Sequence, residues 1–155
     1  VHHGNGTQEA FWEDETVAYL SVHRFPFYPG TGGREETGSG RGLGLTANVP
    51  LPAGAGDAAY AGGFEAALDA LSRRFRPDLV LVSAGFDAHH RDPLGGMQVS
   101  AEGFGRMTRA LAALADAACR GRLVSILEGG YDPDGTAEGA TAHARVLAES
   151  VEPSN

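Results

Sequence analysis

Two apolar runs that lack hydrophobic–polar alternation constrain the fold of this chain most strongly. They are DLVLVSAG at residues 78–85 and RLVSIL at residues 122–127. Apolar runs of this length predict strands that are buried on both faces, as in a parallel sheet. Between them, Ser100 is suited to cap a helix over residues 101–119. That helix carries an apolar stripe of Phe104, Met107, Leu111 and Leu114.

Other elements alternate in the same way along the chain. The patterns predict a short helix at 7–15, strands at 16–23 and 45–51, and helices at 58–75 and 136–150. Pro77 follows the second of these helices and is expected to stop it. Strand–helix alternation predicts an α/β fold with a parallel sheet and helices on both faces. The glycine-rich segment 28–44 lacks the G-x-G-x-x-G spacing and is expected to form a surface loop.

Composition indicates a single ordinary domain. The 155 residues include 20 acidic and 12 basic side chains, for a net charge of −8. An acidic chain is a poor nucleic-acid binder, and no apolar run approaches the ~20 residues of a membrane span. The single Cys119 is expected to be a small core residue, and the cytoplasm is the default location. We expect the domain to cover 1–150 and a tail to cover 151–155.

Polar, glycine-bearing loops directly follow both apolar strands. In parallel α/β sheets, ligand sites lie beyond the carboxyl ends of the strands. The first loop, FDAHHRDPLGG, contains Asp87, His89, His90 and Asp92. These side chains are either ligands of a divalent metal or turn caps and solvated histidines, and the loop alone does not separate the two interpretations. The second loop is EGGYD, and a third, HHGNG, lies at the start of the chain.

The three loops together, HHGNGT, FDAHHRDPLGG and LEGGY in that order, resemble the motifs of the histone deacetylase superfamily. The resemblance runs from Val1 to about Leu147 and is closest to class II-like and bacterial members, including acetylpolyamine amidohydrolases. It implies a three-layer arginase–deacetylase fold of which this chain is the C-terminal part, with the N-terminal part missing.

The resemblance implies a zinc-dependent amide hydrolase that removes acetyl or acyl groups from lysine side chains, polyamines or small amides. His2 and Asp87 match two zinc ligands, and the third, an aspartate, would precede Val1. Tyr131 matches the residue that stabilises the transition state. The family's histidine pair that shuttles protons is absent from this sequence.

Further positions carry over from the family. Tyr28 and Leu94 match the walls of the acyl channel, and Gly129 and Gly130 match glycines beside the acyl pocket. Residues expected around the zinc ligands are Asp92, His3 and Asn5. Structural K⁺ or Na⁺ sites are implied at Ser21 and Val22 with the His2 carbonyl, and at Phe11, Asp14 and Val17.

Two alternatives remain open from the sequence. One is an arginase-like enzyme with two manganese ions, and the other is a non-catalytic module that binds acylated ligands or a partner. Because one ligand and the proton shuttle are absent, we expect the isolated chain to be inactive. Strand edges left open by a cut sheet also predict aggregation. Oligomerisation is possible and is not determined by the sequence.

Overall fold

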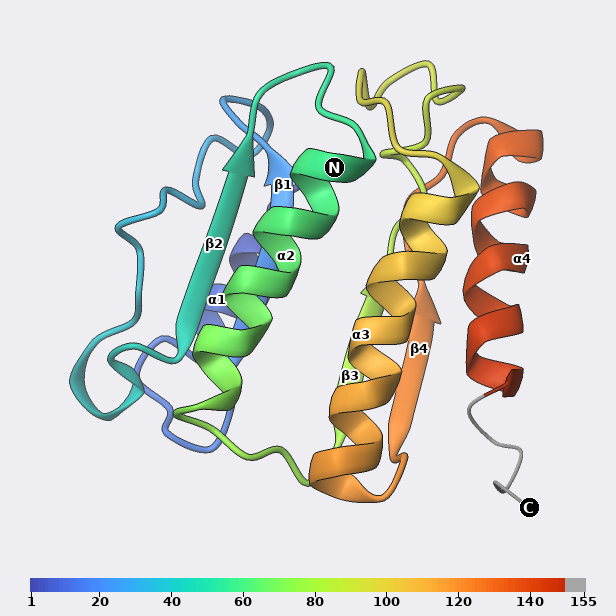
Figure 1. The fold of residues 1–155 in the computed structure, drawn as a ribbon. Helices are drawn as coiled ribbons and strands as arrows, with labels where there is room; N and C mark the ends of the chain where they lie inside the picture. The colour runs from blue at the N-terminus through green and yellow to red at the C-terminus, as the bar shows by residue number, and fades with distance from the viewer. Residues whose placement is uncertain (150–155) are drawn as a thin grey trace.

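Helices and strands alternate along the chain, as Figure 1 shows for a computed structural model that describes residues 1–149. The predicted tail 151–155 and the last predicted helical residue, Ser150, lie outside the described residues. The elements are α1 (Asn5–Ala10), β1 (Tyr19–Arg24), the 3-10 turn η1 (Gly40–Gly42), β2 (Thr46–Leu51), α2 (Asp57–Ser72), β3 (Val80–Ala84), α3 (Ala101–Cys119), β4 (Leu123–Leu127) and α4 (Pro133–Glu149).

The strands form two parallel pairs. β1 pairs with β2, with Tyr19 opposite Thr46, and β3 pairs with β4, with Val80 opposite Leu123. Within residues 1–149 these pairs are separate two-stranded sheets rather than one continuous sheet. The predicted parallel direction is therefore correct. The helices α2 and α3 lie side by side and link the two halves (Figure 1).

The β1–β2 pair is covered on both faces. Val49 faces α2, where a side chain at Gly63 would come within 2.6 Å of the Val49 Cγ1 atom. On the other face, Asn48 Nδ2 donates a hydrogen bond of 2.7 Å to Gln8 Oε1 of α1. This half of the molecule has the three layers that the sequence predicts.

The β3–β4 pair corrects the prediction that both apolar strands are buried on both faces. Leu81 lies opposite Val124 and Ser83 opposite Ile126, and all four are exposed. Leu81 is 66% exposed and Ile126 is 55% exposed. Side chains on the other face pack on α3 and α4. The β3–β4 pair therefore has one apolar face that no described residue covers.

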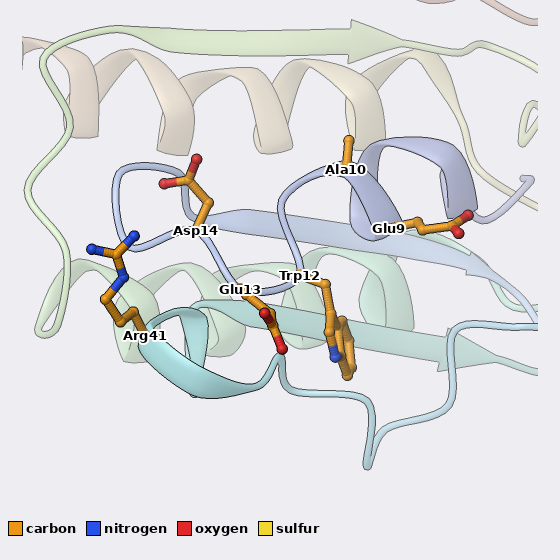
Figure 2. A pocket seen from close by; sticks show the side chains of 6 residues that line it. All are labelled: Glu9, Ala10, Trp12, Glu13, Asp14 and Arg41. Atoms are coloured by element: carbon orange, nitrogen blue, oxygen red, sulfur yellow. The ribbon is translucent and has the colours of Figure 1, made fainter.

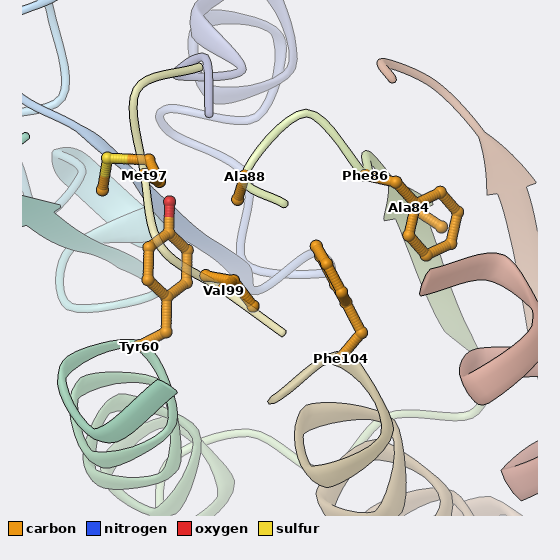
Figure 3. Packing of buried hydrophobic residues seen from close by; sticks show 7 residues of the cluster. All are labelled: Tyr60, Ala84, Phe86, Ala88, Met97, Val99 and Phe104. Atoms are coloured by element: carbon orange, nitrogen blue, oxygen red, sulfur yellow. The ribbon is translucent and has the colours of Figure 1, made fainter. Parts of the chain in front are cut away.

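The main core joins the two halves. Figure 3 shows Tyr60 of α2, Phe104 of α3, and Met97 and Val99 from the preceding loop around the same centre. Phe86, which follows β3, meets the Phe104 ring edge-on with 5.2 Å between centroids. Burial of these large apolar side chains is the dominant favourable term for packing the halves together.

Several predicted boundaries shift in the structure. α3 begins and ends where predicted, and Ser100 Oγ accepts a 3.2 Å hydrogen bond from Gly103 N as its cap. The first helix ends at Ala10 rather than residue 15, and β1 begins at Tyr19 rather than Thr16. α2 ends at Ser72, ahead of the predicted residue 75, and α4 starts earlier than predicted, at Pro133.

Burial along α3 also differs in detail from the predicted stripe. Phe104 is buried, whereas Met107, Leu111 and Leu114 are only partly buried. The most buried positions include small residues, because α4 packs closely against this helix: Gly105, Thr108, Ala112 and Ala115. Cys119 is buried, as predicted. No helix in residues 1–149 is both long and apolar enough to cross a membrane.

Candidate active site

His2 and Asp87 come together although 85 positions separate them in the sequence. Asp87 follows β3 and is 2% exposed. His2 Nδ1 lies 3.1 Å from Asp87 Oδ2, and the amino group of Val1 lies 2.5 Å from Asp87 Oδ1. A side chain at Gly129 would place its Cβ 2.4 Å from Asp87 Oδ2. Glycine at position 129 is therefore required for the two loops to approach this closely.

The donor atoms of this pair suit a zinc ion. An imidazole nitrogen and a carboxylate oxygen are both common zinc ligands. Within residues 1–149, no group of three or more histidine, cysteine or acidic side chains is placed to hold a metal. The pair therefore fits part of a zinc site, which needs at least one further protein ligand to be complete.

Asp92 ties both sides of the site together. Its Oδ1 accepts hydrogen bonds from Leu94 N at 2.9 Å and Gly95 N at 2.8 Å. Its Oδ2 accepts from Tyr131 N at 2.8 Å. The side chains of Leu94 and Tyr131 are 57% and 50% exposed. One buried carboxylate thus positions the backbone of both, while their side chains stay open to solvent.

Tyr131 itself stands at the edge of the site. In the part of the chain that the structure describes, its side chain makes no hydrogen bond with His2 or Asp87. The neighbouring Gly130 has φ +150°, a conformation that L side chains rarely adopt. Its Cβ would also lie 2.4 Å from Thr136 Oγ1. The glycine pair therefore shapes the turn that presents Tyr131.

An aromatic pair from the β1–β2 loop lies against His2. The Phe27 ring stacks on the His2 ring with 5.4 Å between centroids, and Tyr28 meets it edge-on at 6.3 Å. Tyr28 is 77% exposed. The Arg24 guanidinium lies 4.3 Å above the Phe27 ring. Sequence reasoning identified Tyr28 but missed Phe27 and Arg24; the signal available was the spacing of aromatic residues in RFPFY.

The remaining residues expected near the zinc ligands lie in different environments. His3 is 4% exposed, and its Nε2 lies 2.9 Å from Gln8 Oε1. Asn5 is exposed at the start of α1. Its side chain makes no hydrogen bond to the described residues. His89 is buried, and burial lowers its pKa, whereas His90 is exposed.

At the first proposed cation site, the contacts of His23 determine whether the Ser21 hydroxyl donates or accepts. His23 Nε2 lies 3.0 Å from the Gly32 carbonyl oxygen, which can only accept. Nε2 therefore carries the proton, and Nδ1 accepts from Ser21 Oγ at 2.9 Å. Ser21 Oγ therefore acts as a donor in this contact. Burial lowers the pKa of His23 to about 4, so the ring is neutral near pH 7. Val22 follows Ser21 in β1.

The second proposed cation site lies elsewhere, next to a surface hollow. Figure 2 shows this hollow at the C-terminal end of α1, lined by Glu9, Ala10, Trp12, Glu13, Asp14 and Arg41. Asp14 accepts hydrogen bonds from the Thr16 hydroxyl and amide, which lower its pKa. Phe11, Asp14 and Val17 all belong to this segment. None of the lining residues belongs to the His2–Asp87 site, so the hollow is separate from it.

Comparison with known proteins gives consistent matches. A family model described as "Histone deacetylase domain" matches residues 1–147. The chain is 44% identical over 135 residues to a probable deacetylase of Archaeoglobus fulgidus, covering 87% of this chain and 38% of that protein. It is 44% identical over 153 residues to histone deacetylase HDA1 of Saccharomyces cerevisiae, covering 95% of this chain and 21% of that protein. The chain therefore spans well under half the length of these relatives.

Solved structures agree with the sequence matches. The HD domain of HDA15 superimposes with a TM-score of 0.85 at 43% identity, over 96% of this chain and 43% of that one. An acetylpolyamine aminohydrolase from Burkholderia pseudomallei gives a TM-score of 0.84 at 37% identity, over 95% of this chain and 42% of that one. Because these matches span nearly all of its length, the chain belongs to the histone deacetylase domain family and has part of the α/β arginase–deacetylase fold.

Proposed function

We propose that the complete protein is a zinc-dependent amide hydrolase that removes acetyl or acyl groups from lysine side chains or polyamines. The observation that carries the proposal is the approach of His2 Nδ1 to 3.1 Å from Asp87 Oδ2 beyond the strand ends. Tyr131 and Leu94 border the same site through Asp92. Relatives named as deacetylases support the same activity.

His2 and Asp87 would hold the zinc ion together with a ligand from outside this chain. When bound, zinc polarises the amide carbonyl and makes its bound water acidic. We expect a general base from outside the chain as well, because the sequence lacks the histidine pair that the family resemblance implies for this role. The isolated chain is therefore expected to show no turnover.

The residues of this chain bind and orient the substrate. Tyr131 donates a hydrogen bond to the carbonyl oxygen as it becomes negatively charged during attack by water. Tyr28 and Leu94 flank the acylated chain of the substrate. Gly129 and Gly130 let the backbone approach the acyl group closely. The released products are a carboxylate and a free amine.

The test uses the complete protein, with acetyl-lysine peptide and acetylated polyamine as substrates. Tyr131→Phe is expected to lower kcat by about 10²–10³, the cost of one oxyanion donor, with metal content unchanged. Removal of metal with a chelator should abolish turnover, and one equivalent of zinc should restore it. Full activity of Tyr131→Phe would contradict its role. A requirement for two manganese ions would favour the arginase-like alternative, and binding without turnover would favour the non-catalytic one.

A further inference from the structure

The loop between β1 and β2 lies over the candidate site and carries the aromatic residues that touch His2. Phe27 stacks on His2, and Tyr28 meets the same ring edge-on. Three residues separate Tyr28 from Gly32 and Gly33, which lead into a turn closed by a 3.0 Å hydrogen bond from Glu36 N to the Gly33 carbonyl oxygen, and both glycines are buried. Because Gly32 packs against the ring of His3, the neighbour of His2, the position of this turn limits where the aromatic pair can lie relative to His2.

Glu36 anchors that turn with both carboxylate oxygens. Its Oε1 accepts hydrogen bonds from Gly32 N at 3.0 Å and Gly33 N at 2.9 Å. Its Oε2 accepts from Gln8 Nε2 of α1 at 2.5 Å. The Glu36 backbone carbonyl accepts from Asn48 Nδ2 of β2 at 3.2 Å. The side chain of Glu36 thus joins the loop to the first helix, and its backbone carbonyl makes a separate bond to a strand.

The same hydrogen-bond network extends from Glu36 through Gln8 to His3, the residue next to His2. Because Gln8 Nε2 donates to Glu36, Gln8 Oε1 is left to accept from His3 Nε2 at 2.9 Å and Asn48 Nδ2 at 2.7 Å. His3 Nδ1 then accepts from Thr31 Oγ1 at 2.8 Å. Residues Gln8, His3 and Asn48 are all less than 9% exposed, so few water molecules compete for these bonds.

The network requires a charged acceptor at position 36. All three side-chain contacts of Glu36 come from N–H donors, so both oxygens must accept. Burial on its own would raise the pKa of Glu36, but hydrogen bonds from Gly33, Gln8 and Gly32 together lower it. An amide in place of the carboxylate would point one N–H₂ group at another donor, which costs the bond and leaves a donor unpaired.

The packing of the turn adds a second constraint. A Cβ at Gly32 would lie 2.5 Å from His23 Nε2 and 2.7 Å from the His3 ring, and Gly32 has φ +93°. The turn is therefore held between two imidazole rings on one side and by Glu36 on the other. It cannot shift without breaking the network.

We propose that Glu36 is a positioning residue for substrate binding, whose carboxylate holds Phe27 and Tyr28 against His2 by anchoring the Gly32–Gly33 turn to Gln8 of α1. The inference rests on the proposed function, since Tyr28 borders a substrate channel only if the protein acts on acylated chains. Glu36 lies behind the loop and touches no substrate in this role.

The experiment compares Glu36→Gln with Glu35→Gln in the complete protein. Glu35 is the exposed neighbour, and its carboxylate lies against Gly33 but makes no hydrogen bond to the described residues. Both variants remove one negative charge, so the pair separates anchoring from net charge. The first measurement is hydrogen exchange of the Gly32 and Gly33 amides without substrate. We expect faster exchange in Glu36→Gln only, because the two amides then bond to a neutral amide oxygen, a weaker acceptor than a carboxylate.

The second measurement is steady-state kinetics with an acetyl-lysine peptide. Glu36→Gln should raise KM roughly five- to tenfold, the scale of losing one ordinary hydrogen bond, with kcat within about twofold. Glu36→Asp keeps the carboxylate on a shorter arm and should give a smaller rise in KM. It serves as the second variant if Glu36→Gln does not fold.

The outcomes are separable. Turnover by the unmodified protein with unchanged KM in Glu36→Gln and Glu36→Asp overturns the role of Glu36 alone. An equal rise in KM for Glu35→Gln also overturns it, because net charge then explains the effect. Absence of turnover in the unmodified protein on every acylated amine overturns the proposed function and this role with it. Faster exchange together with the selective rise in KM supports the proposal.

Discussion

At the scale of single residues, Asp92 connects the two loops of the candidate site. It accepts hydrogen bonds from the backbone of Leu94, Gly95 and Tyr131, which come from two loops on neighbouring strands. The carboxylate is 7% exposed. Hydrogen bonds to a buried charge are stronger than neutral ones, so this side chain fixes the spacing between the two loops.

Replacing Asp92 by Asn is therefore expected to impair catalysis more than metal binding. One oxygen becomes an N–H₂ group that faces a backbone donor, at a cost of about 1.5–3 kcal/mol, or roughly one to two orders of magnitude in kcat. Steady-state kinetics and metal analysis of the complete protein measure both effects. The control is Asp134→Asn, an exposed carboxylate that pairs with Arg91. Equal losses in the two variants would contradict this role for Asp92.

His143 predicts how stability depends on pH. Thr108 Oγ1 donates to the Phe104 carbonyl, so it accepts from His143 Nδ1 at 2.8 Å, and His143 Nε2 accepts from Ser125 Oγ at 2.8 Å. Burial lowers the pKa of His143 in the folded protein. Below about pH 6.5 the unfolded chain binds a proton more readily than the folded one, so stability is present above that pH and is lost as the pH falls.

The measurement is the free energy of unfolding of the complete protein between pH 7.5 and pH 5. His143→Leu should be less stable at pH 7.5 because Ser125 loses its partner. It should also show a shallower loss of stability as the pH falls. Thr141→Leu, an exposed change on the same helix, should keep the original slope. Parallel curves for the unmodified protein and His143→Leu would show that His143 does not titrate as described.

At the scale of elements, the start of α3 shows how a local signal is reinforced by a distant contact. Ser100 Oγ accepts from Gly103 N at 3.2 Å and donates to Asp57 Oδ2 at 2.6 Å. Asp57 Oδ1 also accepts from Ser100 N at 2.8 Å. Asp57 is the first residue of α2, so the cap of one helix is bonded to the first turn of its neighbour.

Ser100→Ala is expected to lower the free energy of unfolding by about 1–2 kcal/mol, because the cap and the bond to Asp57 are both lost. Chemical denaturation of the complete protein measures the change. Ser72→Ala provides the matched control, since Ser72 is exposed at the end of α2 and bonds only to a carbonyl of its own helix. Its effect should stay within about 0.5 kcal/mol. A larger loss for Ser72→Ala would contradict the reasoning.

At the scale of the whole molecule, the main unusual feature is that β3 and β4 leave one apolar face exposed. Leu81, Val124 and Ile126 form an apolar strip on that face. Val1 lies between the two strand pairs and contacts both. The Val1 carbonyl accepts from Arg24 N at 2.9 Å at the end of β1, while the Val1 amino group contacts Asp87 after β3.

The isolated chain is therefore expected to self-associate through this strip. Sedimentation at increasing concentration should show oligomers, and Ile126→Arg should shift them toward monomer, because a charge in an apolar contact is costly. Leu43→Arg is the control: Leu43 is 65% exposed but lies in a loop away from the strip. Equal effects of the two changes, or a monomeric unmodified chain, would contradict this assignment.

Much of this protein was determined by the sequence alone. Ser100 and the apolar spacing after it specified α3 to the residue, because capping and helical periodicity are local properties. The order of the three motifs identified the family, whose model matches residues 1–147. The family resemblance implied that His2 and Asp87 lie together, whereas the rule that sites gather at the carboxyl ends of parallel strands indicated only the loops after the two apolar strands.

Only the tertiary structure decided which faces are buried and which side chains share hydrogen bonds. The apolar runs at β3 and β4 are the same whether one face or both are covered, so the sequence could not show that Leu81 is exposed. Glu36 and Gln8 lie 28 positions apart, and neither carries a local signal for the other. Burial and long-range hydrogen bonds depend on how distant segments pack, and short-range patterns in a chain do not encode that directly.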